Sequence, residues 1–403
     1  MTRRTLSIVA ACGALLGILF IPTTVSAQDK ARVIIPEKAT DIMPLDDVRV
    51  GMKGYGMTVF HGTDIEPFAV EVVSVMRDFG PKQAVIWVRS DDERMQLTGP
   101  VAGMSGSPIY LWDENQAGEP GEGGRLIGAF AFGYRGGKDC YVGVQAIEQM
   151  IAAADRADVN GERAAKAPDA PAQHVRATMD LLLAQARSRQ MPERRIRRLE
   201  LLRDTVFGEQ AAQDAMPARP TAALPASLEG ESQAMLLPVT LGSRRLGAPL
   251  SSLLAPMGLM PVAAPIGQPI GKPPHGIDGE AIDIRPGSVL SIPFAWGEMD
   301  LSAAGTVTDV TPDGRVLAFG HAMDAIGDTA VPMASGFVHF IQPNIDTSFK
   351  LSGSGAMLGT IIRDEHSAVI GVEQARFKSA PAKITVNLPG QPAREYNYQM
   401  LEH

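Results

Sequence analysis

The chain is poor in cysteine, in aromatic side chains and in positive charge. Its 403 residues include 2 cysteines and 5% aromatic residues, and the formal net charge is −8. Because no basic patch dominates, nucleic acid is not an expected partner. The sequence has no phosphate-cradling loop and no His-Glu-x-x-His or paired-cysteine motif, so we expect neither a cofactor nor a metal site. Its 41 glycines and 30 prolines favour turn-rich β structure over helical bundles.

The first 27 residues have the pattern of a secretory signal peptide. Arg3 and Arg4 precede an apolar run over residues 6–21, and the small residues Val25-Ser26-Ala27 mark the expected cleavage site. A retained membrane anchor is the alternative, but the apolar run is short for a bilayer span. No later run is long enough to cross a bilayer. We therefore expect an exported protein, periplasmic or extracellular, with no membrane span in the mature chain.

Removal of this peptide would leave Cys140 as the last cysteine, which excludes an intramolecular disulfide. Stability must then come from the hydrophobic core. We expect Cys140 to be a buried or half-buried small side chain.

The pattern of apolar residues divides the rest of the chain into β-rich and helix-prone parts. Residues 41–152 read as roughly six strands, a number suited to one small barrel, and a helical pattern near residues 145–157 closes this unit. Residues 153–232 are helix-prone and rich in Pro and Ala, and residues 233–283 form a small mixed segment. A second β unit is expected over residues 284–395. The fold class is therefore mainly β, with two barrel-like units and a helical and linker insertion between them.

The stretch "TGPVAGMSGSPIY" at residues 98–110 is open to two interpretations. It is either a hairpin turn or a loop that exposes a nucleophilic serine, Ser105, between Gly103 and Gly106. Glycine permits the sharp backbone angles that such a loop needs. The backbone N–H groups of Gly103 and Ser105 could then form the oxyanion hole, as in the Gly-x-Ser-Gly-x-Pro loop of chymotrypsin-like proteases.

A nucleophilic serine needs a general base, and His321 is the candidate among the seven histidines. It follows an apolar strand and Gly320 in "RVLAFGHAM", where a ring is held firmly but can still meet a partner. The alternative is a core histidine with satisfied hydrogen bonds, and spacing alone favours that alternative.

Two parts of the chain resemble the SpoIVB peptidase family, the bacterial sporulation stage IV protein B serine peptidases. The first is "GPVAGMSGSPIY" with "GRLIGAFAFGY" and the upstream "GMKGYGMTVFHGTDIEPFAVEVVSVM"; the second is "AAGTVTDVTPDGRVLAFGHAM" with "FKLSGSGAMLGTIIRDEHSAVIGV". Together they cover about residues 43–152 and 285–375. The resemblance implies a serine endopeptidase acting on polypeptides, with Ser105 as nucleophile and His321 as base. The serine segment precedes the histidine segment here, an order permuted relative to the sporulation protein, so the two β units must pack together.

The third member of a triad is less well defined. The family's acid lies on the strand before the serine loop, where Asp91 is our choice and Asp92 the neighbour, although the spacing does not match cleanly. Adjacent acids at a strand end are more often a solvated turn. Asp324 and Asp364 are outside candidates, and a Ser–His dyad is a further possibility. The lack of an acid at the spacing that the family shows also supports an alternative function. In that alternative the chain is a catalytically inactive envelope protein that uses the same barrels for binding or as a scaffold.

Overall fold

The computed structural model describes residues 31–157 and 282–402, apart from residues 81–82, 115, 117, 135, 298–300, 324, 375 and 387–393. It also describes residues 183, 187, 196, 200, 233–234, 237–241 and 259–263. The expected signal peptide, most of the expected insertion over residues 153–232, and Asp324 lie outside the described residues. No helix in the described part of the chain is both long enough and apolar enough to span a membrane.

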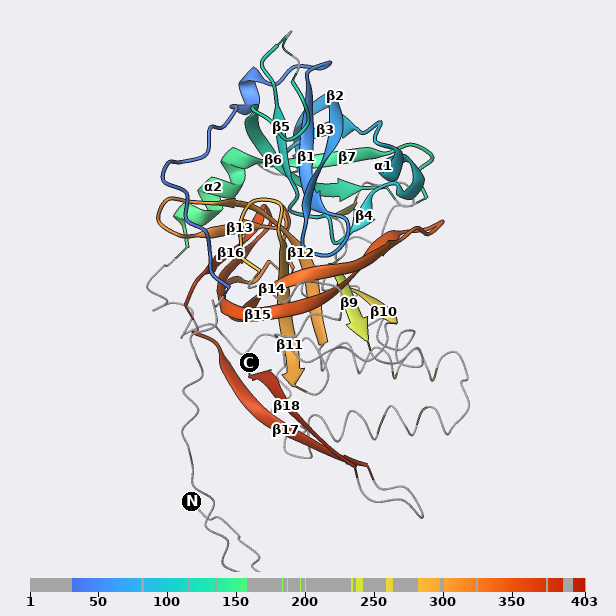
Figure 1. The fold of residues 1–403 in the computed structure, drawn as a ribbon, viewed down its shortest axis with the longest axis vertical. Helices are drawn as coiled ribbons and strands as arrows, with labels where there is room; N and C mark the ends of the chain where they lie inside the picture. Colours follow the sequence, from blue (N-terminus) through green and yellow to red (C-terminus); the bar gives the residue numbers. More distant parts are fainter. Residues whose placement is uncertain are drawn as a thin grey trace, which may run out of the picture. The chain divides into compact units, whose positions relative to one another are not determined.

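The first β unit is a closed six-strand antiparallel barrel (Figure 1). Its strands follow the order β5-β1-β2-β3-β7-β6, and the pairing of β5 with β6 closes the ring. The strands are β1 (Lys53–Val59), β2 (Ile65–Gly80), β3 (Gln83–Arg89), β5 (Pro108–Leu111), β6 (Arg125–Gly133) and β7 (Tyr141–Ala146). This confirms the expected barrel of six strands.

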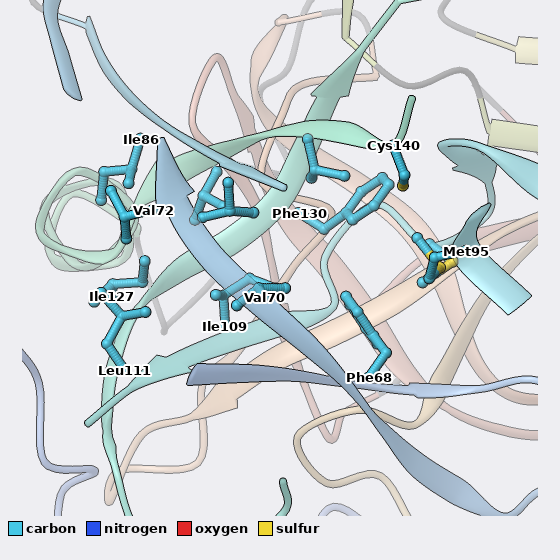
Figure 2. Close-up of a cluster of buried hydrophobic side chains, with 14 of the residues drawn as sticks. Phe68, Val70, Val72, Ile86, Met95, Ile109, Leu111, Ile127, Phe130 and Cys140 are labelled. Atoms are coloured by element: carbon cyan, nitrogen blue, oxygen red, sulfur yellow. The ribbon is translucent and has the colours of Figure 1, made fainter. Parts of the chain in front are cut away.

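The sequence pattern explains the barrel interior. Along β2, Phe68, Val70 and Val72 are buried and alternate with exposed residues, as the two-residue period of a strand requires. β3 carries a buried run, "AVIWV", rich in the β-branched residues that suit strands. Figure 2 shows Phe68, Val70 and Val72 of β2 and Ile86 of β3 in the same barrel core as Phe130 of β6. Cys140 is also in this core as a free thiol, which confirms that it is buried.

The second β unit is a ring of strands in the order β11-β12-β13-β16-β15-β14, closed by the pairing of β14 with β11. The strands are β11 (Val289–Gly297), β12 (Leu301–Val310), β13 (Val316–Ala318), β14 (Gly327–Gln342), β15 (Ser348–Glu365) and β16 (Ala368–Val372). A separate core of apolar residues, centred on Ile292, Val307 and Phe319, fills this ring. The described structure is thus the expected mainly β, two-barrel fold.

The remaining elements extend or join the two barrels. β18 (Arg394–Glu402) and β17 (Lys378–Val386) extend the second sheet at β11, and β18 runs past the expected boundary at residue 395. β9 (Leu237–Leu241) and β10 (Leu259–Ala263) extend the sheet at β12. β8 (Gln233–Ala234) pairs with β6 of the first barrel, whereas β4 (Val101–Ala102), just before the serine, pairs with β15 of the second. The helical elements whose full bounds lie within the described residues are the 3-10 turn η1 (Leu45–Asp47), α1 (Glu93–Thr98) and α2 (Ile147–Asp155). The helix expected at the end of the first unit is therefore confirmed by α2.

Candidate active site

The serine loop, residues 103–107, connects β4 to β5. It is a tight turn in which the N–H of Ser107 donates to the carbonyl oxygen of Met104 at 2.9 Å. Ser105 is 0% exposed, and its Oγ has no hydrogen-bond partner among the described residues. Since buried polar groups in folded proteins are nearly always hydrogen-bonded, this hydroxyl is a candidate functional group.

The second barrel holds the serine loop through two threonines of β12. The N–H of Thr306 donates to the carbonyl oxygen of Ser105 at 2.8 Å, and the Thr306 hydroxyl donates to that of Gly103 at 3.1 Å. The Thr308 hydroxyl donates to the carbonyl oxygen of Gly106 at 2.8 Å. The loop belongs to the first barrel by sequence, but the second barrel also holds its backbone.

The histidine segment follows β13, which lies beside β12. Phe319 and Gly320 both have a φ of 69°, a left-handed conformation that is strained for a phenylalanine. The N–H of Phe319 donates to the carbonyl oxygen of Thr306 at 3.2 Å. This sharp turn at the strand end places His321, which is 2% exposed.

The serine and histidine segments converge on one carbonyl oxygen, that of Phe130 in β6. The N–H of Gly106 donates to this oxygen at 2.7 Å, and a Cβ on Gly320 would lie 3.4 Å from it. A Cβ on Gly106 would in turn lie 2.5 Å from the backbone N of Phe319. Ser105 and His321 are the residues next to these two glycines. The structure therefore brings the two segments together across the barrel interface, although 216 positions separate the residues in the sequence.

The His321 ring has its Nδ1 2.7 Å from the carbonyl oxygen of Ala322. A carbonyl can only accept, so Nδ1 carries the hydrogen and Nε2 is the basic nitrogen. The buried carboxylate of Asp364, at the end of β15, accepts a hydrogen bond from the N–H of Met323 at 2.9 Å. Asp364 therefore fixes the backbone two residues after His321.

The acids chosen from the sequence lie elsewhere. Asp91 is exposed, and its carboxylate forms an ion pair with Arg89. Asp92 is the N-cap of α1 and accepts from the N–H of Arg94 at 2.9 Å, an interaction that satisfies a free N–H in the first helical turn. The two aspartates thus have local structural roles, and no described contact joins either of them to the serine loop or to His321.

The expected oxyanion-hole donors belong to this tight loop. The N–H groups of Met104, Gly106 and Ser107 all donate to carbonyl oxygens. By contrast, no described backbone carbonyl accepts from the N–H of Ser105. An oriented N–H without a backbone acceptor is what an oxyanion hole requires.

A hollow of about 720 Å³ lies between α2 and the turn from β15 to β16. Gln149 and Arg156 line it on one side, and Asp364 and His366 on the other. Ser105 and His321 are not part of its lining, so this hollow reaches Asp364 but neither the serine nor the histidine.

Sequence reasoning missed several residues that shape the site. Thr306 and Thr308 alternate in "GTVTDV", and that two-residue period was a signal that both hydroxyls share one face of a strand. Lys350 was also missed; it is a single charge between Phe349 and Leu351 in a strand, and it is 1% exposed. No simple pattern marks Asp364 in preference to its charged neighbours.

No family model, curated protein or solved structure matches the chain. The resemblance to the SpoIVB peptidase family thus stays a prediction from the two motif segments.

Proposed function

We propose that the chain is an exported serine endopeptidase in which Ser105 is the nucleophile and His321 the general base. The observation that carries this proposal is the convergence of Gly106 and Gly320 on the Phe130 carbonyl oxygen. It supports a site built from both barrels, which is the arrangement that the permuted motif order demands. A triad is defined by geometry and not by chain order. Export follows only from the sequence pattern of residues 1–27.

The chemistry is acyl transfer in two steps. Ser105 Oγ attacks the carbonyl carbon of a peptide bond while His321 Nε2 takes the hydroxyl proton. The N–H groups of Gly103 and Ser105 stabilise the tetrahedral oxyanion. The histidine then gives its proton to the leaving amine, and a water molecule hydrolyses the acyl-enzyme by the same route.

Asp364 is the better supported acid for this site. It is buried beside the histidine segment, whereas Asp91 is exposed in an ion pair with Arg89. Its bond to the N–H of Met323 holds the turn that carries His321. We assign to Asp364 a positioning role and an electrostatic one, because a nearby carboxylate favours the imidazolium that forms during catalysis.

Access to Ser105 requires a movement, since its side chain is 0% exposed. β8 pairs with β6 of the first barrel and β9 with β12 of the second, and a Cβ on Gly103 would lie 3.2 Å from Pro238 Cγ in β9. We infer that β9 covers the loop in a closed resting form and withdraws when a polypeptide binds. The same burial favours the second candidate, a non-catalytic binding protein of the envelope.

Labelling with a fluorophosphonate probe separates these candidates. The wild-type chain should be labelled, Ser105→Ala and His321→Ala should not, and the matched control Ser352→Ala should be labelled at the wild-type rate. Ser352 is a suitable control because it is also buried, and its hydroxyl has no hydrogen-bond partner in the described part of the chain. If wild type and an opened variant, Pro238→Gly, both fold but take no label, the endopeptidase proposal is wrong and the binding protein is favoured.

A further inference from the structure

Lys350 is a buried lysine beside the serine loop. It follows Phe349 of β15, which pairs in register with Ala102 of β4, so its strand runs past the start of the loop. A Cβ on Gly103 would lie 3.2 Å from Lys350 Cβ and 3.4 Å from Cγ. The alkyl part of the lysine therefore packs directly against the loop backbone.

The ammonium group of Lys350 has a neutral partner. Its Nζ donates to the hydroxyl of Thr58 in β1 at 2.7 Å, in a fully buried contact. Among the described ion pairs, none includes this lysine, and the residues that contact it from β1 and from the serine loop, Thr58 and Gly103, are uncharged. A buried lysine without a carboxylate is rare because burial disfavours its charge.

The hydrogen bonds continue from Thr58 into the serine loop. The hydroxyl oxygens of Thr58 and Ser107 lie 3.0 Å apart, and the Ser107 hydroxyl also lies 2.7 Å from the carbonyl oxygen of Met104. The carbonyl can only accept, so the single hydroxyl hydrogen of Ser107 goes to Met104. The hydrogen between the two hydroxyls then comes from Thr58. The chain of donors runs from Lys350 through Thr58 and Ser107 to the Met104 carbonyl.

That carbonyl belongs to the same peptide group as the N–H of Ser105. A hydrogen bond accepted by a peptide oxygen polarises the group and makes its N–H a stronger donor. We propose that Lys350, acting through Thr58 and Ser107, polarises the Met104–Ser105 peptide and so strengthens the oxyanion-hole N–H of Ser105. Lys350 is thus a positioning residue that does not touch the substrate. This inference rests on the proposed function.

Burial lowers the pKa of Lys350 from 10.5 to about 7. The protonated amine is the stronger donor, so the rate should fall as this proton is lost. A histidine base has the opposite effect, because it must be neutral to accept a proton. The two together should give a bell-shaped dependence of rate on pH.

The test is the second-order rate of fluorophosphonate labelling of the full-length mature chain. In this reaction Ser105 Oγ attacks phosphorus, fluoride leaves, the hydroxyl proton goes to His321, and the phosphoryl oxygen occupies the oxyanion hole. Thr58→Val, which keeps the side-chain shape but removes the hydroxyl, should lower the rate about threefold to tenfold, less than the loss of a whole oxyanion donor. Thr58→Ser restores the hydroxyl and should restore the rate, and Ser352→Ala should leave it unchanged.

Lys350→Met tests the pH dependence of the labelling rate, which would not change if Lys350 had a purely structural role. The alkaline limb of the pH–rate profile should disappear in this variant, while the acid limb remains. If folded Thr58→Val and Lys350→Met are labelled at the wild-type rate with an unchanged profile, the inference about Lys350 is wrong and the proposed endopeptidase stands. If neither the wild type nor the opened variant Pro238→Gly is labelled, the proposed function itself fails.

Discussion

Replacing Lys350 with methionine should make the protein more stable at low pH, by an amount that follows from the burial of the amine. The pKa of Lys350 falls from 10.5 to about 7 because burial penalises the charged form. At about 1.4 kcal/mol for each pH unit, this difference corresponds to about 5 kcal/mol. Methionine has a similar length and no charge, and it adapts to irregular core space. Loss of the hydrogen bond to Thr58 offsets about 1 kcal/mol.

The sign of the pH dependence follows from proton linkage. Between pH 7 and pH 10.5 the unfolded chain keeps the lysine proton and the folded chain does not, so the stability of the wild type rises with pH in this window. Below pH 7 the destabilisation by the buried ammonium is fully present, and above pH 10.5 it is absent. Lys350→Met should therefore be more stable than wild type by about 2–4 kcal/mol at pH 6, after allowance for local relaxation. The difference should shrink by about 1.4 kcal/mol per pH unit above pH 7.

Urea denaturation at pH 6, 7.5 and 9 measures this difference, because other titrating groups cancel between the two chains. The exposed Lys53→Met is the matched control and should follow the wild type at every pH. A gap between Lys350→Met and wild type that stays constant from pH 6 to pH 9 would refute the reasoning, since Lys350 would then not change its charge in that range.

Three further predictions concern the loop and the core. In urea denaturation, Gly106→Ala should be less stable than Gly51→Ala by more than about 2 kcal/mol. Both glycines have positive φ, but only a Cβ on Gly106 meets backbone atoms. Equal losses of unfolding free energy in the two variants would show that the interface tolerates the Cβ. Pro238→Gly should raise the fluorophosphonate labelling rate several-fold, because it removes the ring that packs on Gly103, and an unchanged rate would mean that β9 is not the cover. Cys140, whose thiol pKa is raised to about 12 by burial, should react with a thiol reagent such as Ellman's only in denaturant; rapid reaction of the folded chain would contradict its position in the core.

The β architecture could be predicted from the sequence because strand periodicity is local. The alternation along β2 and the β-branched run of β3 are visible within a few residues, and several such strands in one stretch of about 110 residues predict a small barrel. The same reasoning could not predict that β4 leaves the first barrel to pair with β15 of the second. Only two residues of β4 pair, and nothing local in Val101 and Ala102 identifies a partner about 250 positions later.

The candidate site was predicted in part for a related reason. Ser105 and the turn at Gly320 can be recognised in the sequence by their neighbouring glycines. Glycine marks backbone conformations that other residues adopt with difficulty. Acids carry no such mark. The sequence favoured Asp91 and its neighbour Asp92 and left Asp364 as an outside candidate. The structure makes Asp92 a helix N-cap and buries Asp364 beside the histidine segment. This assignment depends on long-range packing that single-sequence patterns do not encode.

The features that cost stability are concentrated in and around the serine loop, and that concentration is itself an argument for function. Within the described residues, Lys350 is buried without a carboxylate partner and the Ser105 hydroxyl has no hydrogen-bond partner, and Phe319 has a left-handed backbone. Apolar or relaxed alternatives would fold more stably at each position, so a purely structural role accounts for none of them. If they serve catalysis, stability and reactivity must move in opposite directions. Lys350→Met should then be harder to unfold at pH 6 and should be labelled more slowly than the wild type. If the variant gained stability but kept the wild-type labelling rate, Lys350 would not contribute to the reactivity of Ser105.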